Sequence, residues 1–443
     1  MNRLCRICKT SLVAGWLSLL GLQWALAYPL DGEPGTNIRR LQGYLDAQAA
    51  AGGPKLQAGA LLGVNDIRLS LTGYGGPDFD ALPEDPALAS AISKLFSGRD
   101  PSYAMVLVDI SDSGTPRWAG LRPDLRQNAG SVGKTLCMTG LFNELARAFP
   151  DPADRQRVLA TTLVKAGDWV LVGEHQVPHW DAATGRNRFG LIVPEDEFYL
   201  AEWLDHAISA SANGAGSVIW REAMLLRRFG DQYPVPAETA AAFFRDTPRQ
   251  QLGELARSVI TEPLLAAGLD TDNLMQGSFW TGVSKQKVPG TQSFATPREL
   301  ARWLFRLEQG RLVDAWSSLE MKRYLYMTKR RYRYAYAPEL ATSAVFFKSG
   351  SLYQCVPEEG YRCAKYMGNK RNMMNSIAIV ESPAAAPGHR YLVTLMSNVL
   401  KVNSAWDHSR IAAAIHELVL TRAPVQLRES SSAEELRDAG KSD

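Results

Sequence analysis

The stretch with the clearest chemical meaning is Ser131-Val132-Gly133-Lys134. Side chains three positions apart on a helix lie on one face, so the amine of Lys134 can reach the hydroxyl of Ser131. A serine hydroxyl becomes a useful nucleophile when a neighbouring base takes its proton. Lysine is such a base only when neutral, and lowering its pKa from about 10.4 to about 7 costs roughly 4.6 kcal/mol. Burial and a nearby cation have that effect, so the pattern predicts a second lysine.

Two further motifs supply the missing groups. Lys348-Ser349-Gly350 lies in the apolar, strand-like segment "AVFFKSGSL", where Gly350 would let a substrate approach the backbone closely. Ser211-Ala212-Asn213 follows a helical pattern that ends near Ile208, and offers a hydroxyl for proton transfer and an amide for holding a substrate carbonyl. The ordered set predicts an acyl-transfer site built on a serine.

Two other interpretations of the same residue types are weaker. Gly133-Lys134-Thr135 looks like the end of a phosphate-binding loop, but that motif needs glycine where this chain has Asn128. A nucleotide-binding protein therefore ranks below the other hypotheses. A second S-x-x-K, Ser284 to Lys287, is expected in a loop before Pro289-Gly290, where nothing would turn its lysine toward its serine.

The elements that must position these motifs follow from hydrophobic periodicity. Apolar runs separated by a turn predict a hairpin, and later runs predict three more strands. Helical spacing is found after Gly130, and Thr296-Pro297 forms a typical helix start. The expected strands are 103–110, 116–121, 343–352, 375–382 and 390–400, and the expected helices follow Gly130 and cover 197–211, 296–313 and 404–422. This order predicts an α+β fold, an antiparallel sheet flanked by N- and C-terminal helices with an inserted all-helical subdomain.

The ends of the chain indicate export. Residues 1–27 have basic residues, an apolar run and a small-residue end, as in a secretory signal peptide. Residues 28–100 are an N-terminal extension of unassigned role, 101–422 the domain that holds the motifs, and 423–443 a charged tail expected to be disordered. We expect a periplasmic or secreted protein with no membrane span after signal cleavage.

The net charge and the cysteine content indicate which partners and which disulfides to expect. Removing the signal leaves 46 basic and 46 acidic residues (49 minus three, against 46), so a dedicated nucleic-acid partner is not expected. In an oxidising compartment Cys355 and Cys363 are candidates for a disulfide, and Cys137 is expected to be an inert core thiol. No metal and no cofactor is expected, and the sequence does not indicate an oligomeric state.

With these motifs in place, the chain resembles the class A β-lactamase and penicillin-binding protein family of active-site serine hydrolases. The hairpin before Ser131, the segment "FATPRELARWLFRLEQGRLVD" and the late strands and helix follow the family's order from about Ser102 to Arg422. The resemblance implies a β-lactamase/transpeptidase-like fold, and a β-lactam or a peptidoglycan-like D-Ala-D-Ala amide as substrate.

The resemblance also implies a role for each motif position. Ser131 would be the acylated nucleophile, Lys134 its base or proton relay, Ser211 the proton donor to the leaving nitrogen, and Asn213 a substrate-orienting amide. Lys348 and Ser349, followed by Gly350, would bind the substrate carboxylate, and the backbone N–H groups of Ser131 and Ser351 would form the oxyanion hole.

The chain departs from the family pattern in three places. Ser211-Ala212-Asn213 lacks the usual central aspartate, and Ser349 replaces a threonine. Family β-lactamases also carry a water-activating glutamate on the loop before the T-P-R helix, whereas residues 273–298 contain no Asp or Glu. We therefore expect slow deacylation, unless a distant acid such as Asp246 or Glu254 takes the place of that glutamate in the folded chain. The alternative is a non-catalytic binding or sensor domain of the cell envelope.

Other conspicuous residues favour ordinary structural roles. His175 and His179 are spaced as on a helix, but Pro178 interrupts it and no third zinc ligand is near. His206 is expected to pack within its helix. The basic and aromatic stretch 321–336 is expected to be a solvated face or a cleft wall; if functional, it could meet an anionic cell-wall polymer.

Overall fold

The computed structural model of the protein describes residues 29–52, 56–171, 175–327 and 333–421. The expected signal peptide, at 1–27, and the expected tail, at 423–443, lie outside these residues. The strands are β1 Ala104–Asp109, β2 Arg117–Leu121, β3 Leu163–Lys165, β4 Gln176–Asp181, β5 Arg186–Leu191, β6 Glu197–Tyr199, β7 Leu274–Met275, β8 Phe294–Ala295, β9 Ala344–Gln354, β10 Arg371–Ser382 and β11 His389–Ser397.

The helices of the described residues alternate with these strands and gather mainly in the middle of the chain. They are α1 Glu33–Thr36, α2 Arg40–Ala49, α3 Pro86–Leu95, α4 Lys134–Ala148, α5 Pro152–Thr161, α6 Leu200–Ile208, α7 Asn213–Phe229, α8 Ala237–Asp246, α9 Arg249–Ala266, α10 Gly282–Lys287, α11 Pro297–Glu308, α12 Ala315–Tyr326 and α13 Ser404–Leu420.

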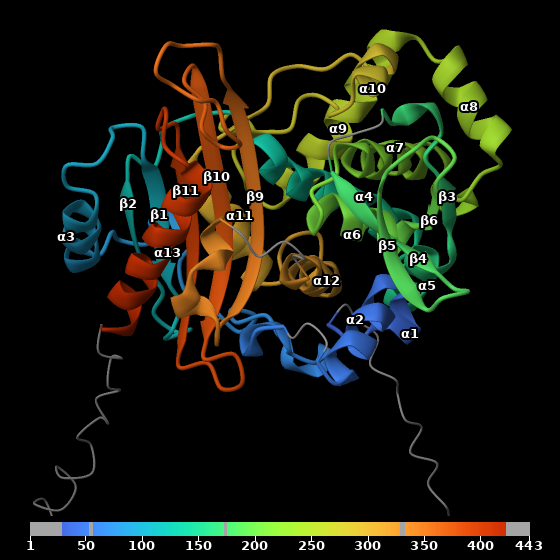
Figure 1. The fold of residues 1–443 in the computed structure, drawn as a ribbon. Helices are drawn as coiled ribbons and strands as arrows, with labels where there is room; N and C mark the ends of the chain where they lie inside the picture. The colour runs from blue at the N-terminus through green and yellow to red at the C-terminus, as the bar shows by residue number, and fades with distance from the viewer. Residues whose placement is uncertain (1–28, 53–55, 172–174, 328–332, 422–443) are drawn as a thin grey trace, which may run out of the picture.

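One antiparallel sheet of five strands organises the fold, in the order β2-β1-β11-β10-β9. Helix α13 packs on one face, and α11 and α12 pack on the other (Figure 1). Alternate residues of β1 face opposite layers, because Met105 and Leu107 join the cluster under α13 while Val106 and Val108 join the cluster on the other face. The expected hairpin, the three late strands and the final helix are all present.

The helical subdomain lies beside the β9 edge of the sheet (Figure 1). Its central helix, α4, contacts α7 and α9, and its residues Lys134 to Phe142 are all buried. The predicted cap of α11 is also present, because the side chain of Thr296 accepts a hydrogen bond from the backbone N–H of Glu299. The expected arrangement of a flanked antiparallel sheet with an inserted helical subdomain is confirmed.

The segment 29–100 is packed into the rest of the structure. Ile38 and Leu41 belong to the main core, and α3 packs against β2. Arg40 forms two hydrogen bonds to the buried carboxylate of Asp205 on α6, at 2.5 and 2.7 Å. This segment therefore supports the helix that leads into the Ser211 motif.

Two local expectations differ from the structure. Residues 197–199 form β6 rather than the first turn of α6, because Phe198 and its neighbours pair with β3. Ser284 to Lys287 lie in the short helix α10 rather than a loop, because Thr281 caps that helix. As Pro178 indicated, His175 and His179 do not share a helix: His179 lies on β4, and its ring packs on Phe198. Among the described residues, no helix is long and apolar enough to cross a membrane.

Candidate active site

Ser131 and Lys134 meet at the start of the central helix. Ser131 lies in a single 3-10 turn, Gly130–Gly133, that runs directly into α4. The amine of Lys134 donates a hydrogen bond to Oγ of Ser131 at 2.7 Å and another to Oδ1 of Asn213 at 2.9 Å. The expected helical spacing thus brings the amine onto the hydroxyl.

The surroundings of Lys134 favour the neutral amine. Its side chain is fully buried, and burial lowers its pKa from 10.5 to about 7. The positive charge of Arg333 contributes to this lowering, whereas the thiol of Cys137 acts in the opposite direction. Cys137 is itself buried, and burial raises the pKa of its thiol, as expected for a core cysteine.

The second lysine is present, but its amine binds another hydroxyl. Nζ of Lys348, on β9, donates to Oγ of Ser211 at 2.8 Å and to its neighbour's carbonyl, Ser349 O, also at 2.8 Å. Burial, and then the charges of Lys134 and Arg333, hold the pKa of Lys348 well below its usual value. The two amines therefore contact separate hydroxyls, Lys134 with Ser131 and Lys348 with Ser211.

The backbone of β9 lies directly against the turn that carries Ser131. A Cβ on Gly350 would lie 2.3 Å from the carbonyl oxygen of Ala129 and 2.7 Å from the backbone nitrogen of Ser131, so only glycine fits. Gly130 adopts a left-handed φ of 54° and faces the backbone nitrogen of Ser351. The backbone nitrogens of Ser131 and Ser351 are thus held on adjoining segments.

Arg333 is a site residue that sequence analysis missed. It is buried, and its guanidinium donates hydrogen bonds to the hydroxyls of Ser349, Ser351 and Tyr366. The stretch 321–336 was expected to form a solvated face or a cleft wall, and Arg333 instead supplies a cation beside both lysines. Its position in a run of exposed-looking cations gave no signal of this role.

The loop before α11 closes over the other side of Lys134. It is bounded by the pairing of β7 with β8, and the ring of Trp280 lies 4.8 Å from Nζ of Lys134. The side chain of Gln276 packs on Gly133, where a Cβ would lie 1.9 Å from Oε1. The glycine that suggested a phosphate loop thus makes room for this glutamine.

No described carboxylate forms a hydrogen bond or ion pair with Ser131, Lys134, Ser211 or Lys348. The two distant acids considered as substitutes are exposed: Asp246 pairs with Arg245, and Glu254 accepts from Gln250. Neither contacts the site.

Other candidate residues have structural contacts. Ser284, the serine of the second S-x-x-K, is buried, and its hydroxyl donates to the carbonyl of Trp169 at 2.7 Å. His206 is buried against Phe198. Across the described ranges, no group of three or more His, Cys, Asp or Glu side chains is arranged to hold a metal ion. Cys355 and Cys363 form a disulfide at the end of β9.

No protein-family model and no curated protein matches the sequence. The structure is similar to solved structures of PBP-A and of β-lactamases. A variant of PBP-A solved as an acyl-enzyme complex with penicillin G has 13% identity and a TM-score of 0.46, over 77% of this chain and 98% of that one. A β-lactamase from Sphaerobacter thermophilus has 15% identity and a TM-score of 0.47, over 76% and 98%.

A class A β-lactamase of the last common ancestor of Gram-negative bacteria has 19% identity and a TM-score of 0.46, over 75% of this chain and 99% of that one. These similarities concern the fold alone, and at such identities and TM-scores we draw no activity from them. The fold that the sequence resemblance implied, a β-lactamase and penicillin-binding protein-like fold, is also the fold of these solved structures.

Proposed function

We propose that the protein is an exported serine hydrolase that forms an acyl-enzyme through Ser131 with a β-lactam or a D-Ala-D-Ala-like amide. The observation that carries the proposal is the buried Lys134 amine, 2.7 Å from Oγ of Ser131 and with its pKa lowered to about 7. An amine in this state can take the hydroxyl proton at neutral pH as Oγ attacks the amide carbonyl.

The backbone N–H groups of Ser131 and Ser351 form the oxyanion hole in this proposal. Charge develops on the carbonyl oxygen during attack, and donors fixed beforehand stabilise it without reorganisation. The contact of Gly350 with the Ser131 turn keeps the two segments in register. Loss of one such donor typically lowers the rate by about 10² to 10³.

Ser211 delivers the proton that the leaving nitrogen needs. Its hydroxyl accepts a hydrogen bond from Lys348, whose lowered pKa favours a neutral amine that can exchange protons with it. The amide oxygen of Asn213 accepts a hydrogen bond from Lys134. The amide N–H₂ of Asn213 orients the substrate by donating to a substrate carbonyl. Collapse of the tetrahedral intermediate then breaks the C–N bond and leaves the acyl group on Ser131.

Arg333 supplies the positive charge for the substrate carboxylate. With the pKa of Lys348 well below its usual value, the guanidinium is the cation that stays charged at neutral pH. It also holds the hydroxyls of Ser349 and Ser351, which are further donors to a carboxylate.

Deacylation is slow in this proposal, because water lacks a base. The ring of Trp280 covers Lys134, and no described carboxylate bonds to the reacting groups. A long-lived acyl-enzyme suits a peptidase or transferase of peptidoglycan-like amides better than an efficient antibiotic-destroying enzyme.

Intact mass spectrometry after incubation with benzylpenicillin tests the proposal. We expect one covalent adduct of the mass of the drug, persisting after its removal, and no adduct in Ser131→Ala. Absence of an adduct would favour the non-catalytic binding domain, and an equal adduct in Ser131→Ala would overturn Ser131 as the acylated residue. Ser284→Ala is the matched control, because it alters the serine of the other S-x-x-K and should acylate as the wild type does.

A further inference from the structure

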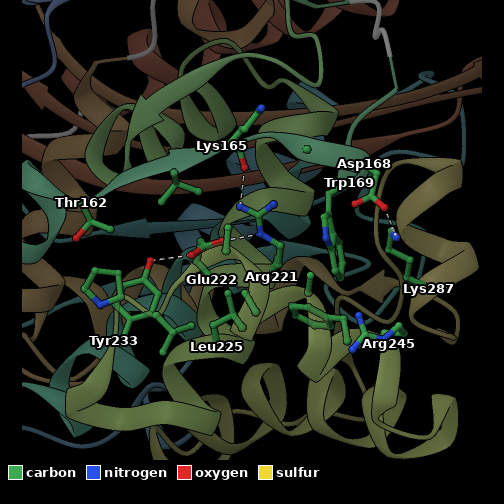
Figure 2. A pocket seen from close by; sticks show the side chains of 18 of the residues that line it. Thr162, Lys165, Asp168, Trp169, Arg221, Glu222, Leu225, Tyr233, Arg245 and Lys287 are labelled. Atoms are coloured by element: carbon green, nitrogen blue, oxygen red, sulfur yellow. Dashed lines mark hydrogen bonds and ion pairs between the residues drawn. The ribbon is translucent and has the colours of Figure 1, made fainter.

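A cavity lies on the helical subdomain, lined by other residues than those of the proposed acylation site. Its volume is about 740 Å³, and it is lined by the turn before β4, by α7 and α8, by the connection between them and by the end of α10 (Figure 2). The two serines and two lysines of that site, Ser131, Ser211, Lys134 and Lys348, do not line the cavity. Cavities of roughly 300 to 1,000 Å³ accommodate small organic ligands.

The inner wall of the cavity is aromatic and aliphatic. Trp169 and Phe244 meet edge to face with ring centroids 4.6 Å apart, and Leu225, Val235 and Ala240 complete the wall. Such a wall gains free energy by covering an apolar body, at roughly 25 cal/mol per Å² of apolar surface removed from water. It favours a ligand with an aromatic ring or a compact branched chain.

The polar floor is satisfied by its own partners. Arg221 donates to Glu222 at 2.5 Å and to the carbonyl oxygens of Lys165 and Ala166, and Tyr233 donates to the other oxygen of Glu222 at 2.8 Å (Figure 2). Burial raises the pKa of Tyr233, so its hydroxyl stays a neutral donor. The charges of Arg221 and Glu222 on the floor therefore balance each other. The charged side chains at the rim are the ones that can distinguish anionic from cationic ligands.

The rim is predominantly cationic. Four basic side chains, Lys165, Arg245, Arg249 and Lys287, face two acidic ones, Asp168 and Glu197, a difference of two positive charges. Lys287 pairs with Asp168, and Arg245 pairs with the adjacent Asp246.

Two of these rim cations, Lys165 and Arg249, are exposed, and neither forms an ion pair with a carboxylate in the described part of the chain. Glu197 lies opposite Lys165 in the β3–β6 register without an ion pair between them. An anion at the mouth beside Arg249 would therefore meet a cation that no described carboxylate neutralises.

We propose that this cavity binds a small amphipathic anion, with an aromatic or branched apolar body against Trp169 and Phe244 and a carboxylate or sulfonate at the mouth beside Arg249. The apolar wall supplies most of the affinity, because ion pairs at an exposed rim are individually weak. The rim charges select the sign of the ligand and make binding salt-dependent.

Titration with 8-anilinonaphthalene-1-sulfonate, an aromatic anion whose fluorescence rises in apolar sites, tests the proposal. The protein is first acylated or carries Ser131→Ala, so that a reaction at Ser131 does not affect the measured fluorescence. We expect one saturable site with a Kd of roughly 10 to 100 μM. The uncharged analogue N-phenyl-1-naphthylamine should bind several-fold more weakly, and the difference should shrink at high salt.

Two pairs of variants locate the site. Ala241→Trp, on the exposed cavity face of α8, should raise Kd at least tenfold, whereas Thr239→Trp on the opposite, exposed face of that helix should not. Arg249→Glu should weaken the anion several-fold, and Arg257→Glu, two turns along α9 and outside this cavity, should leave it unchanged. Thermal unfolding verifies that all four variants fold.

Three results would overturn the proposal: no saturable binding up to about 1 mM, equal binding of the neutral analogue, or Ala241→Trp binding as Thr239→Trp does. These outcomes are independent of acylation at Ser131, because the Ser131→Ala background removes that reaction.

Discussion

The pH dependence of acylation follows from the state of one amine. Lys134 must be neutral to take the proton of Ser131, and burial lowers its pKa from 10.5 to about 7. The neutral fraction is then about 9% at pH 6 and about 91% at pH 8, so acylation should accelerate roughly tenfold over this interval. The acylation rate rises with pH, because the deprotonated amine is the base and its population rises with pH.

The free-energy cost of this neutral amine is considerable. A pKa of about 7 in place of 10.5 corresponds to roughly 5 kcal/mol against the charged form. Replacing the amine by a guanidinium, which keeps its proton at neutral pH, removes the base. Lys134→Arg should therefore lower the acylation rate by about 10² to 10⁴, the usual contribution of a positioned base.

The assay is the second-order rate of benzylpenicillin acylation, followed by quenching and intact mass at pH 6, 7 and 8. Lys287→Arg is the matched control, since Lys287 is the lysine of the other S-x-x-K and pairs at the surface with Asp168. A rate that is level between pH 6 and 8, or unchanged in Lys134→Arg, would refute Lys134 as the base.

Three further perturbations probe other parts of the structure. Arg333→Ala should slow acylation by carboxylate-bearing β-lactams about tenfold or more beyond its effect on an ester analogue, because loss of the charge also raises the pKa of Lys134 and so affects both substrates alike. Trp280→Glu places a carboxylate beside the Lys134 amine and should speed release of the acyl group about tenfold or more, as measured by decay of the mass adduct; an unchanged lifetime would argue against the missing-base explanation. Arg40→Met leaves the buried Asp205 carboxylate unpaired and should lower the free energy of unfolding by about 3 to 5 kcal/mol in urea titrations, whereas a loss below about 1 kcal/mol would exclude a structural role for that pair.

Much of the fold follows from local sequence patterns. The sheet strands carry long apolar runs, and helix α11 begins with a side-chain cap and a proline, so their positions can be predicted from neighbouring residues alone. The contact of Lys134 with Ser131 is equally local, because three positions of helix fix it. The pairing of Lys348 with Ser211, in contrast, joins residues far apart in the chain.

The residues that the sequence did not indicate act through long-range packing. Arg333 enters the site because its segment lies against β9 and α13, and a run of cations and aromatics carries no local mark of that arrangement. Trp280 reaches Lys134 because β7 and β8 close the loop that bears it. Arg40 forms its ion pair across 165 positions of sequence. None of these contacts has a periodicity that a sequence pattern could reveal.

The most direct test of the central claim is a crystal structure of the protein soaked with benzylpenicillin. We expect electron density continuous from Oγ of Ser131 to the opened lactam, with the acyl oxygen within hydrogen-bond distance of the backbone nitrogens of Ser131 and Ser351. The drug's carboxylate should lie beside Arg333. Density joined to another residue, or an intact lactam held without a bond to Ser131, would contradict the account.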